Sequence, residues 1–145
     1  MRAGAALLTA IAALTLTGCA STPPVRGPML GPVDLSRPFL ALGTEPFWDV
    51  EFTGSEVRFR GMDTSEPPAP QPAPELSGAT AVYRTRLPDG RPLITTLSVE
   101  DCSDGMSDRI YPLTAVVMLG DGRLEGCAAS VSAIEKTRDD QRTVD

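Results

Sequence analysis

The feature that most constrains the fold is an alternation of apolar and polar residues with a period of two. In the stretch 47–52, Trp48, Val50 and Phe52 share one face of an extended chain, and two acidic residues occupy the other. This period is typical of a strand with one buried face, and no stretch has a convincing amphipathic helical period. Further strands are predicted at 57–60, 79–87, 93–99, 115–119 and 123–129. We therefore predict an all-β domain, a small antiparallel barrel or sandwich of about six to eight strands.

The N-terminal stretch has the pattern of a bacterial export signal. Arg2 precedes a mostly apolar run at 3–17, which is too short to span a bilayer comfortably. The run ends in Leu16-Thr17-Gly18-Cys19, which resembles the recognition sequence of bacterial lipoproteins. That resemblance implies cleavage before Cys19 and anchoring in membrane lipid through its acyl chains. Ala20, the next residue, implies the outer membrane, with the domain facing the periplasm. An ordinary secretory leader with an incidental cysteine is the alternative.

Proline and glycine content divides the rest of the chain. After a signal peptide at 1–18, the segment 19–38 holds five prolines and two glycines and is predicted to be a lipidated, disordered tether. The β domain is predicted at 39–132. It is interrupted at 66–74 by five prolines, which indicate an extended solvated loop or, alternatively, a segment recognised by a proline-binding partner. The residues 133–145 are polar and are predicted to form a frayed tail.

Charge and the absence of histidine exclude several classes of function. The formal net charge is −6, which argues against binding nucleic acid and against electrostatic adhesion to anionic lipid. The chain has no histidine, so the commonest general base and the commonest metal ligand are missing. We therefore predict a protein that is not an enzyme and that carries no cofactor and no metal. The enzymatic alternative requires a carboxylate pair, Glu45 with Asp104 or Asp108, converging in a cleft.

The three cysteines fit one lipid anchor and one disulfide. If Cys19 carries lipid, Cys102 and Cys127 are left to pair in an oxidising compartment. Two unpaired buried thiols are the alternative.

The loop after Cys102 is dense in polar residues. Asp101, Asp104 and Asp108 suggest a hard cation, but an EF-hand register would place Cys102 and Tyr111 where oxygen ligands are required. The stronger interpretation is structural. Under this interpretation, Asp104-Gly105 forms a turn, and the Asp108 carboxylate pairs with a nearby charge or caps nearby backbone groups.

Two motifs carry a resemblance to a known family. One is Gly43-Thr44-Glu45-Pro46-Phe47-Trp48, and the other combines 102–108, Tyr111-Pro112 and Gly126-Cys127-Ala128. Together they resemble a family of bacterial envelope lipoproteins and predicted membrane proteins, some of them attached to META-type domains, the small β domains of heat-shock-related lipoproteins. The resemblance covers about 42–129. It implies a Cys102–Cys127 pairing and brings no catalytic role with it.

These observations predict a lipid-anchored envelope protein that is a non-enzymatic binding or envelope-maintenance module for a periplasmic protein or small molecule. A lipocalin-like carrier with Trp48 at a cavity mouth is one alternative, and an inhibitor of a basic hydrolase such as lysozyme is another. Trp48 is interpreted as a core plug at a barrel end, and Glu45 as bound to a neighbouring backbone or to Arg109. The alternative is a ligand-facing set: Glu45, Trp48, Asp104, Met106, Asp108 and Tyr111.

Overall fold

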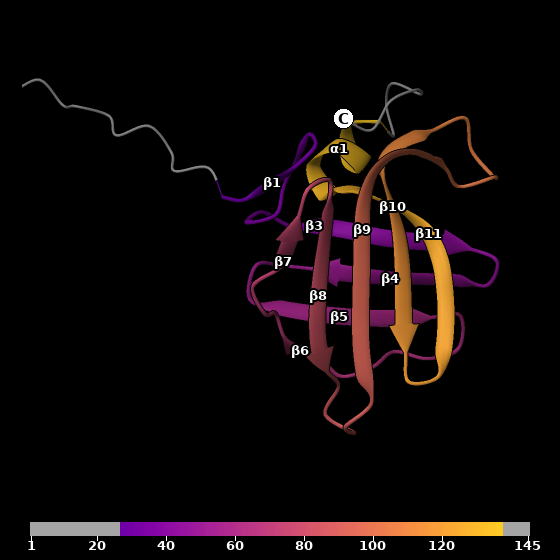
Figure 1. Cartoon of the computed structure of the whole chain (residues 1–145). Helices are drawn as coiled ribbons and strands as arrows, with labels where there is room; N and C mark the ends of the chain where they lie inside the picture. Colours follow the sequence, from indigo (N-terminus) through magenta and orange to yellow (C-terminus); the bar gives the residue numbers. More distant parts are fainter. Residues whose placement is uncertain (1–26, 138–145) are drawn as a thin grey trace, which may run out of the picture.

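The computed structural model of the chain describes residues 27–137 (Figure 1). The predicted signal peptide, Cys19 and the stretch 138–145 lie outside these residues. Within 27–137, no helix is long and apolar enough to cross a membrane. The elements are β1 (Met29–Leu30), β2 (Val33–Asp34), β3 (Phe39–Thr44), β4 (Phe47–Phe52), β5 (Glu56–Gly61), β6 (Ala69–Pro70), β7 (Glu75–Ser77), β8 (Thr80–Arg86), β9 (Pro92–Ser103), β10 (Ile110–Leu119), β11 (Gly122–Ser130) and α1 (Val131–Lys136).

Nine of these strands form one antiparallel sheet in the order β6-β5-β4-β3-β11-β10-β9-β8-β7. The sheet curls into a half-barrel, so that β3, β4 and β5 run across behind the long strands β8 to β11 (Figure 1). The predicted antiparallel all-β fold is therefore confirmed. The strand count is higher than predicted, because β6 and β7 are too short to show an alternation.

The interior of the half-barrel is filled by side chains from both arms of the sheet. The predicted inward face of β4 is buried, with Trp48 4 % exposed and Phe52 fully buried. The rings of Phe39 and Phe52 stack at 4.3 Å, and the ring of Tyr83 lies 4.6 Å from that of Phe52. These aromatic side chains occupy the space that a carrier would need for a ligand.

Tyr83 brings a polar hydroxyl group into this core. Its residue is 1 % exposed, and its hydroxyl has no hydrogen-bond partner among the described residues. Burial raises the pKa of Tyr83 to about 12, because the phenolate would lose its hydration.

The domain begins earlier than the boundary predicted at residue 38. Strands β1 and β2 pair as a short hairpin, in which Gly31 takes a left-handed conformation with φ of 56°. Leu30, Val33 and Leu35 are at most 2 % exposed and belong to the main core. This corrects the predicted tether for its second half. Pro28 precedes β1 and Pro32 lies in the turn, so neither proline removes an N–H donor from the paired residues.

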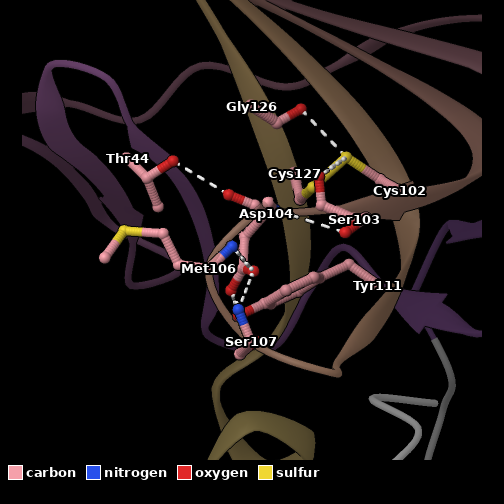
Figure 2. Close-up of a disulfide and its surroundings, with 10 residues drawn as sticks. Thr44, Cys102, Ser103, Asp104, Met106, Ser107, Tyr111, Gly126 and Cys127 are labelled. Carbon is pink, nitrogen blue, oxygen red and sulfur yellow. Dashed lines mark hydrogen bonds between the residues drawn. A yellow bond between two sulfur atoms is a disulfide. The ribbon is translucent and has the colours of Figure 1, made fainter.

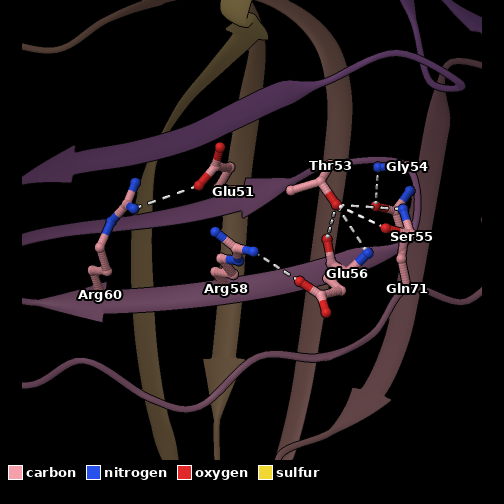
Figure 3. A network of polar contacts seen from close by, with 8 residues as sticks. All are labelled: Glu51, Thr53, Gly54, Ser55, Glu56, Arg58, Arg60 and Gln71. Atoms are coloured by element: carbon pink, nitrogen blue, oxygen red, sulfur yellow. Dashed lines mark hydrogen bonds and ion pairs between the residues drawn. The ribbon is translucent and has the colours of Figure 1, made fainter.

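The proline-rich segment connects the two edge strands of the half-barrel and is less exposed to solvent than predicted. It links β6 to β7, the two opposite edges of the sheet, through residues 71–74. Ala69 is buried, and the hydroxyl of Thr85 donates to the carbonyl oxygen of Pro70 at 3.0 Å. Gln71 accepts from Gly54 at 2.9 Å (Figure 3). Prolines have no N–H group, so this edge is a poor template for further strands.

The end of the described chain is a short helix where a frayed tail was predicted. Ser130 caps α1 by accepting from the N–H group of Ala133 at 3.2 Å. Ala133 is buried in a second cluster with Tyr111, Cys127 and Ala129. A helix of six residues is too short to show a period, so the sequence did not reveal it.

Candidate functional site

The two sequence motifs meet at one end of the half-barrel. Strand β3 ends in Gly43 and Thr44, and the hydroxyl of Thr44 donates to the carbonyl oxygen of Asp104 at 2.9 Å (Figure 2). This bond ties the first motif to the loop between β9 and β10. Segments about sixty residues apart in the chain thus build one surface.

The buried side chain of Trp48 contacts residues of both motifs. Its indole lies against Gly43 and Gly126, and a Cβ atom at Gly43 would collide with the indole ring. A Cβ atom at Gly126 would collide with the backbone carbonyl oxygen of Leu42 and lie 3.0 Å from the indole. Both glycines therefore make room for close packing. Trp48 is buried, as expected of a core plug, and it also lines an outer groove.

The carboxylate of Asp104 organises the loop between β9 and β10. One oxygen accepts from the N–H groups of Met106 at 3.0 Å and Ser107 at 2.8 Å. The other accepts from the hydroxyls of Ser107 at 2.8 Å and Tyr111 at 3.2 Å (Figure 2). Desolvation by burial opposes ionisation, but these donors outweigh it and hold the pKa of Asp104 below its ordinary value. The predicted Asp104-Gly105 turn is present, with φ of 72° at Gly105.

The disulfide between Cys102 and Cys127 braces the same end. It joins β9 to β11 across β10, with a Cα–Cα distance of 5.5 Å, and the predicted pairing is confirmed. Cys102 is opposite Tyr111 and Cys127 is opposite Thr114, and the register between β9 and β10 shifts between Tyr111 and Leu113 beside the bond. Figure 2 shows the bond directly beside the Asp104 loop.

The candidate ligand-facing residues divide into an exposed and a buried group. Glu45, Met106 and Asp108 are exposed, whereas Trp48 and Tyr111 are buried and the Asp104 carboxylate is occupied by the loop. The ion pairs within 27–137 include neither Glu45 nor Asp108, so the expected Glu45–Arg109 contact is absent there.

The aspartates of this loop do not form a metal site with one another. Within 27–137, the structure gathers no three carboxylate or cysteine side chains in a way that would hold a metal ion. Asp101, Asp104 and Asp108 are therefore not brought together as a ligand set.

Two adjoining hollows lie on the outer side of this end. The acidic recess has a volume of about 390 Å³, and its walls include Thr44, Glu45, Asp104 and Glu125. The apolar groove has a volume of about 340 Å³ and is lined chiefly by Leu40, Leu42, Phe47, Trp48 and Met62. The hollows share Leu42, Gly43 and Thr44 as a common wall.

Sequence reasoning missed the most exposed apolar residues of the groove. Phe47 is 51 % exposed and Met62 is 69 % exposed. Phe47 falls out of phase with the buried residues of β4, which was the available signal. Met62 follows β5 in a loop, and nothing in its neighbouring sequence marks it.

The two tyrosines give opposite responses to loss of the hydroxyl. We expect Tyr83→Phe to raise the free energy of unfolding by about 1 kcal/mol, because it removes a buried hydroxyl without a partner among the described residues. We expect Tyr111→Phe to lower it by about 1 kcal/mol, because it breaks the bond to Asp104. Urea unfolding at pH 7 measures both, and a destabilised Tyr83→Phe variant contradicts the first expectation.

The dependence of stability on alkaline pH tests the raised pKa of Tyr83. The folded state holds the Tyr83 proton more tightly than the unfolded chain, because its pKa is raised from 10.0 to about 12. This group therefore leaves stability unchanged below pH 10 and lowers it as the pH rises from about 10 to about 12. We expect Tyr83→Phe to flatten that part of the unfolding profile, whereas Tyr111→Phe keeps the Tyr83 contribution.

Removing the charge of Asp104 loosens the loop. We expect Asp104→Asn to lower the free energy of unfolding by about 1–2 kcal/mol at pH 7, because an amide group cannot accept on both sides. A carboxylate with a lowered pKa contributes stability above its unfolded value of 3.8 and loses it as the pH falls through the folded value. The variant should therefore show a smaller loss of stability in acid. The control is Asp108→Asn, an exposed change expected to stay within about 0.5 kcal/mol.

Comparison with known proteins found no family model, no curated protein and no solved structure that matches this chain.

Proposed function

We propose that this chain is a lipid-anchored protein of the bacterial cell envelope whose β domain binds a periplasmic protein through its outer surface. In this proposal the anchor is acylated Cys19 in the outer membrane, with the domain facing the periplasm, and Ala20 supports that location. The sequence motif Leu16-Thr17-Gly18-Cys19 supports this part of the proposal.

The observation that carries the binding role is the surface built by the two motifs. Phe47 and Met62 leave large apolar side chains exposed beside a hollow, at the end that the disulfide and the Asp104 loop hold in place. Apolar residues gathered around a hollow on a braced surface are typical of protein interaction sites. A role in maintaining the envelope would operate through the same contact.

The rival functions fit these observations less well. A lipocalin-like carrier needs an interior cavity, whereas Phe39, Phe52 and Tyr83 pack against one another there. The enzymatic alternative required a carboxylate pair in a cleft, and Glu45 and Asp104 do line one recess. The Asp104 oxygens accept from four donors, however, which makes that carboxylate poorly suited to proton transfer. An inhibitor of a basic hydrolase remains a special case of the binding role.

The anchoring part is tested by metabolic labelling with an alkyne analogue of palmitate in a bacterial host. We expect wild-type chain to incorporate the label and to fractionate with membranes. Cys19→Ala should lose both properties, whereas Cys102→Ala/Cys127→Ala should keep the label. An unlabelled wild-type chain in the soluble periplasmic fraction contradicts the anchor.

The binding part is tested by formaldehyde cross-linking in intact cells, followed by purification of the tagged chain under denaturing conditions. We expect a discrete adduct with a periplasmic or envelope protein that depends on export of the chain. A domain that yields only monomer under these conditions contradicts the proposal. If the purified chain inhibits a cationic lysozyme, the binding function is inhibition of a hydrolase.

A further inference from the structure

The acidic recess and the apolar groove form one continuous surface with two different chemistries. Register places Leu42, Asp49 and Arg60 opposite one another on neighbouring strands, on the face away from the core. The apolar groove lies on this outer face, and the acidic recess continues from it past Gly43 and Thr44 to β10 and β11. A ligand that crosses the shared wall would therefore contact both hollows.

The recess is negatively charged. Glu45, Asp104 and Glu125 line it, and its lining contains no lysine or arginine. Glu125 pairs with Arg123 at 2.8 Å, while the donors around Asp104 keep that carboxylate ionised. Glu45 is exposed and has no ion-pair partner among the described residues. The recess is thus complementary to a cation.

The groove is apolar and nearly neutral. At its rim, Arg60 pairs with Asp49 at 2.8 Å. It also pairs with Glu51 at 3.4 Å (Figure 3), so its own charge is compensated. The apolar lining residues of the groove are Leu40, Leu42, Phe47, Trp48 and Met62. Such a surface can take up an aliphatic or aromatic side chain and remove its apolar area from water.

We infer that the two hollows together bind an extended segment of a partner protein that carries a lysine or arginine two residues from a large apolar side chain. In an extended chain, side chains at positions i and i+2 point to the same side and lie about 7 Å apart, which suits two adjoining hollows. The cationic side chain occupies the recess and the apolar one occupies the groove. This inference rests on the proposed binding function and names the chemistry of its partner.

The test uses a peptide of three Ser-Arg-Ser-Phe repeats and the chain 19–145 carrying Cys19→Ser, which stays out of the membrane. Trp48 is the only tryptophan and is one of the residues that line the groove, so its fluorescence reports occupancy. We expect saturable binding that weakens as salt is raised. A peptide with glutamate in place of arginine should bind at least about tenfold more weakly, and a peptide with serine in place of phenylalanine about tenfold more weakly.

Matched variants locate the site. We expect Glu45→Gln to weaken binding about threefold and Phe47→Ser about tenfold. The controls make the same kinds of change elsewhere, with Asp121→Asn in the turn between β10 and β11 and Leu76→Ser on β7. Both should leave the affinity within about twofold, and thermal melts of all four variants should show folded protein.

Four outcomes overturn the inference. Three are equal binding of the glutamate peptide, equal weakening by Leu76→Ser and Phe47→Ser, and no binding at all. Binding of arginine amide or glucosamine with the same affinity as the peptide also overturns it, and it assigns the recess to a small cation. If cells still yield an adduct while the peptide fails, the proposed binding function stands and only the partner chemistry is wrong.

Discussion

Removing the disulfide should lower the free energy of unfolding by about 3.5 kcal/mol. The bond closes a loop with a sequence separation of 25, and the chain-entropy model converts that length into about this loss. A domain of this size has only about 5–15 kcal/mol of net stability, so the change is large. We expect Cys102→Ala/Cys127→Ala to show the loss in urea unfolding, together with increased mobility of the Asp104 loop.

Reduction gives an independent measurement of the same bond. Dithiothreitol should lower the melting temperature of the wild-type domain toward that of the double variant and leave the double variant unchanged. Cys19→Ser serves as the control, because it removes a thiol without touching the bond. A wild-type domain that melts at the same temperature with and without reductant contradicts the expected contribution.

Replacing Gly126 by alanine should lower the free energy of unfolding by nearly as much as removing the disulfide. The new Cβ atom would collide with the carbonyl oxygen of Leu42, which belongs to the backbone of β3 and cannot turn away as a side chain can. The strand must shift, and Trp48 must give way with it. We expect a loss of about 3 kcal/mol, at the upper end of typical overpacking, measured by urea unfolding at pH 7.

The matched control is Gly122→Ala on the same strand. Its Cβ atom would lie 3.3 Å from the carbonyl oxygen of Leu119, a close contact that a small shift relieves. We expect a change below about 1 kcal/mol. Equal stabilities for the two variants would show that the packing of Trp48 against β11 is looser than described.

The alternation of residues predicted the strands but not the way the sheet closes. Side-chain period decides which face of β4 is buried, and Trp48, Val50 and Phe52 are accordingly in the core. Period alone does not set the order of strands that lie far apart in the chain, such as β3 beside β11. It also fails for Leu30 and Val33, which are buried at single positions of a two-residue hairpin.

The candidate site was predicted in part for a similar reason. The disulfide follows from cysteine counting once Cys19 is assigned to lipid, and the turn at Asp104 follows from its glycine neighbour. Burial of Trp48 and Tyr111 depends on long-range contacts with Gly126 and Cys127, which no local pattern encodes. The period of β4 already indicated the exposure of Phe47, whereas the exposure of Met62 became visible only when β3, β4 and β5 were placed together.

The most direct test of the central claim is site-specific photo-cross-linking in living cells. A benzophenone amino acid is placed at Phe47 in one strain and at Leu76 in another, since both positions are about half exposed. We expect ultraviolet light to give an adduct with a discrete envelope protein from position 47, none from position 76, and none from position 47 when Glu45→Lys is added. Adducts of equal yield from both positions, or from neither, would contradict binding through this surface.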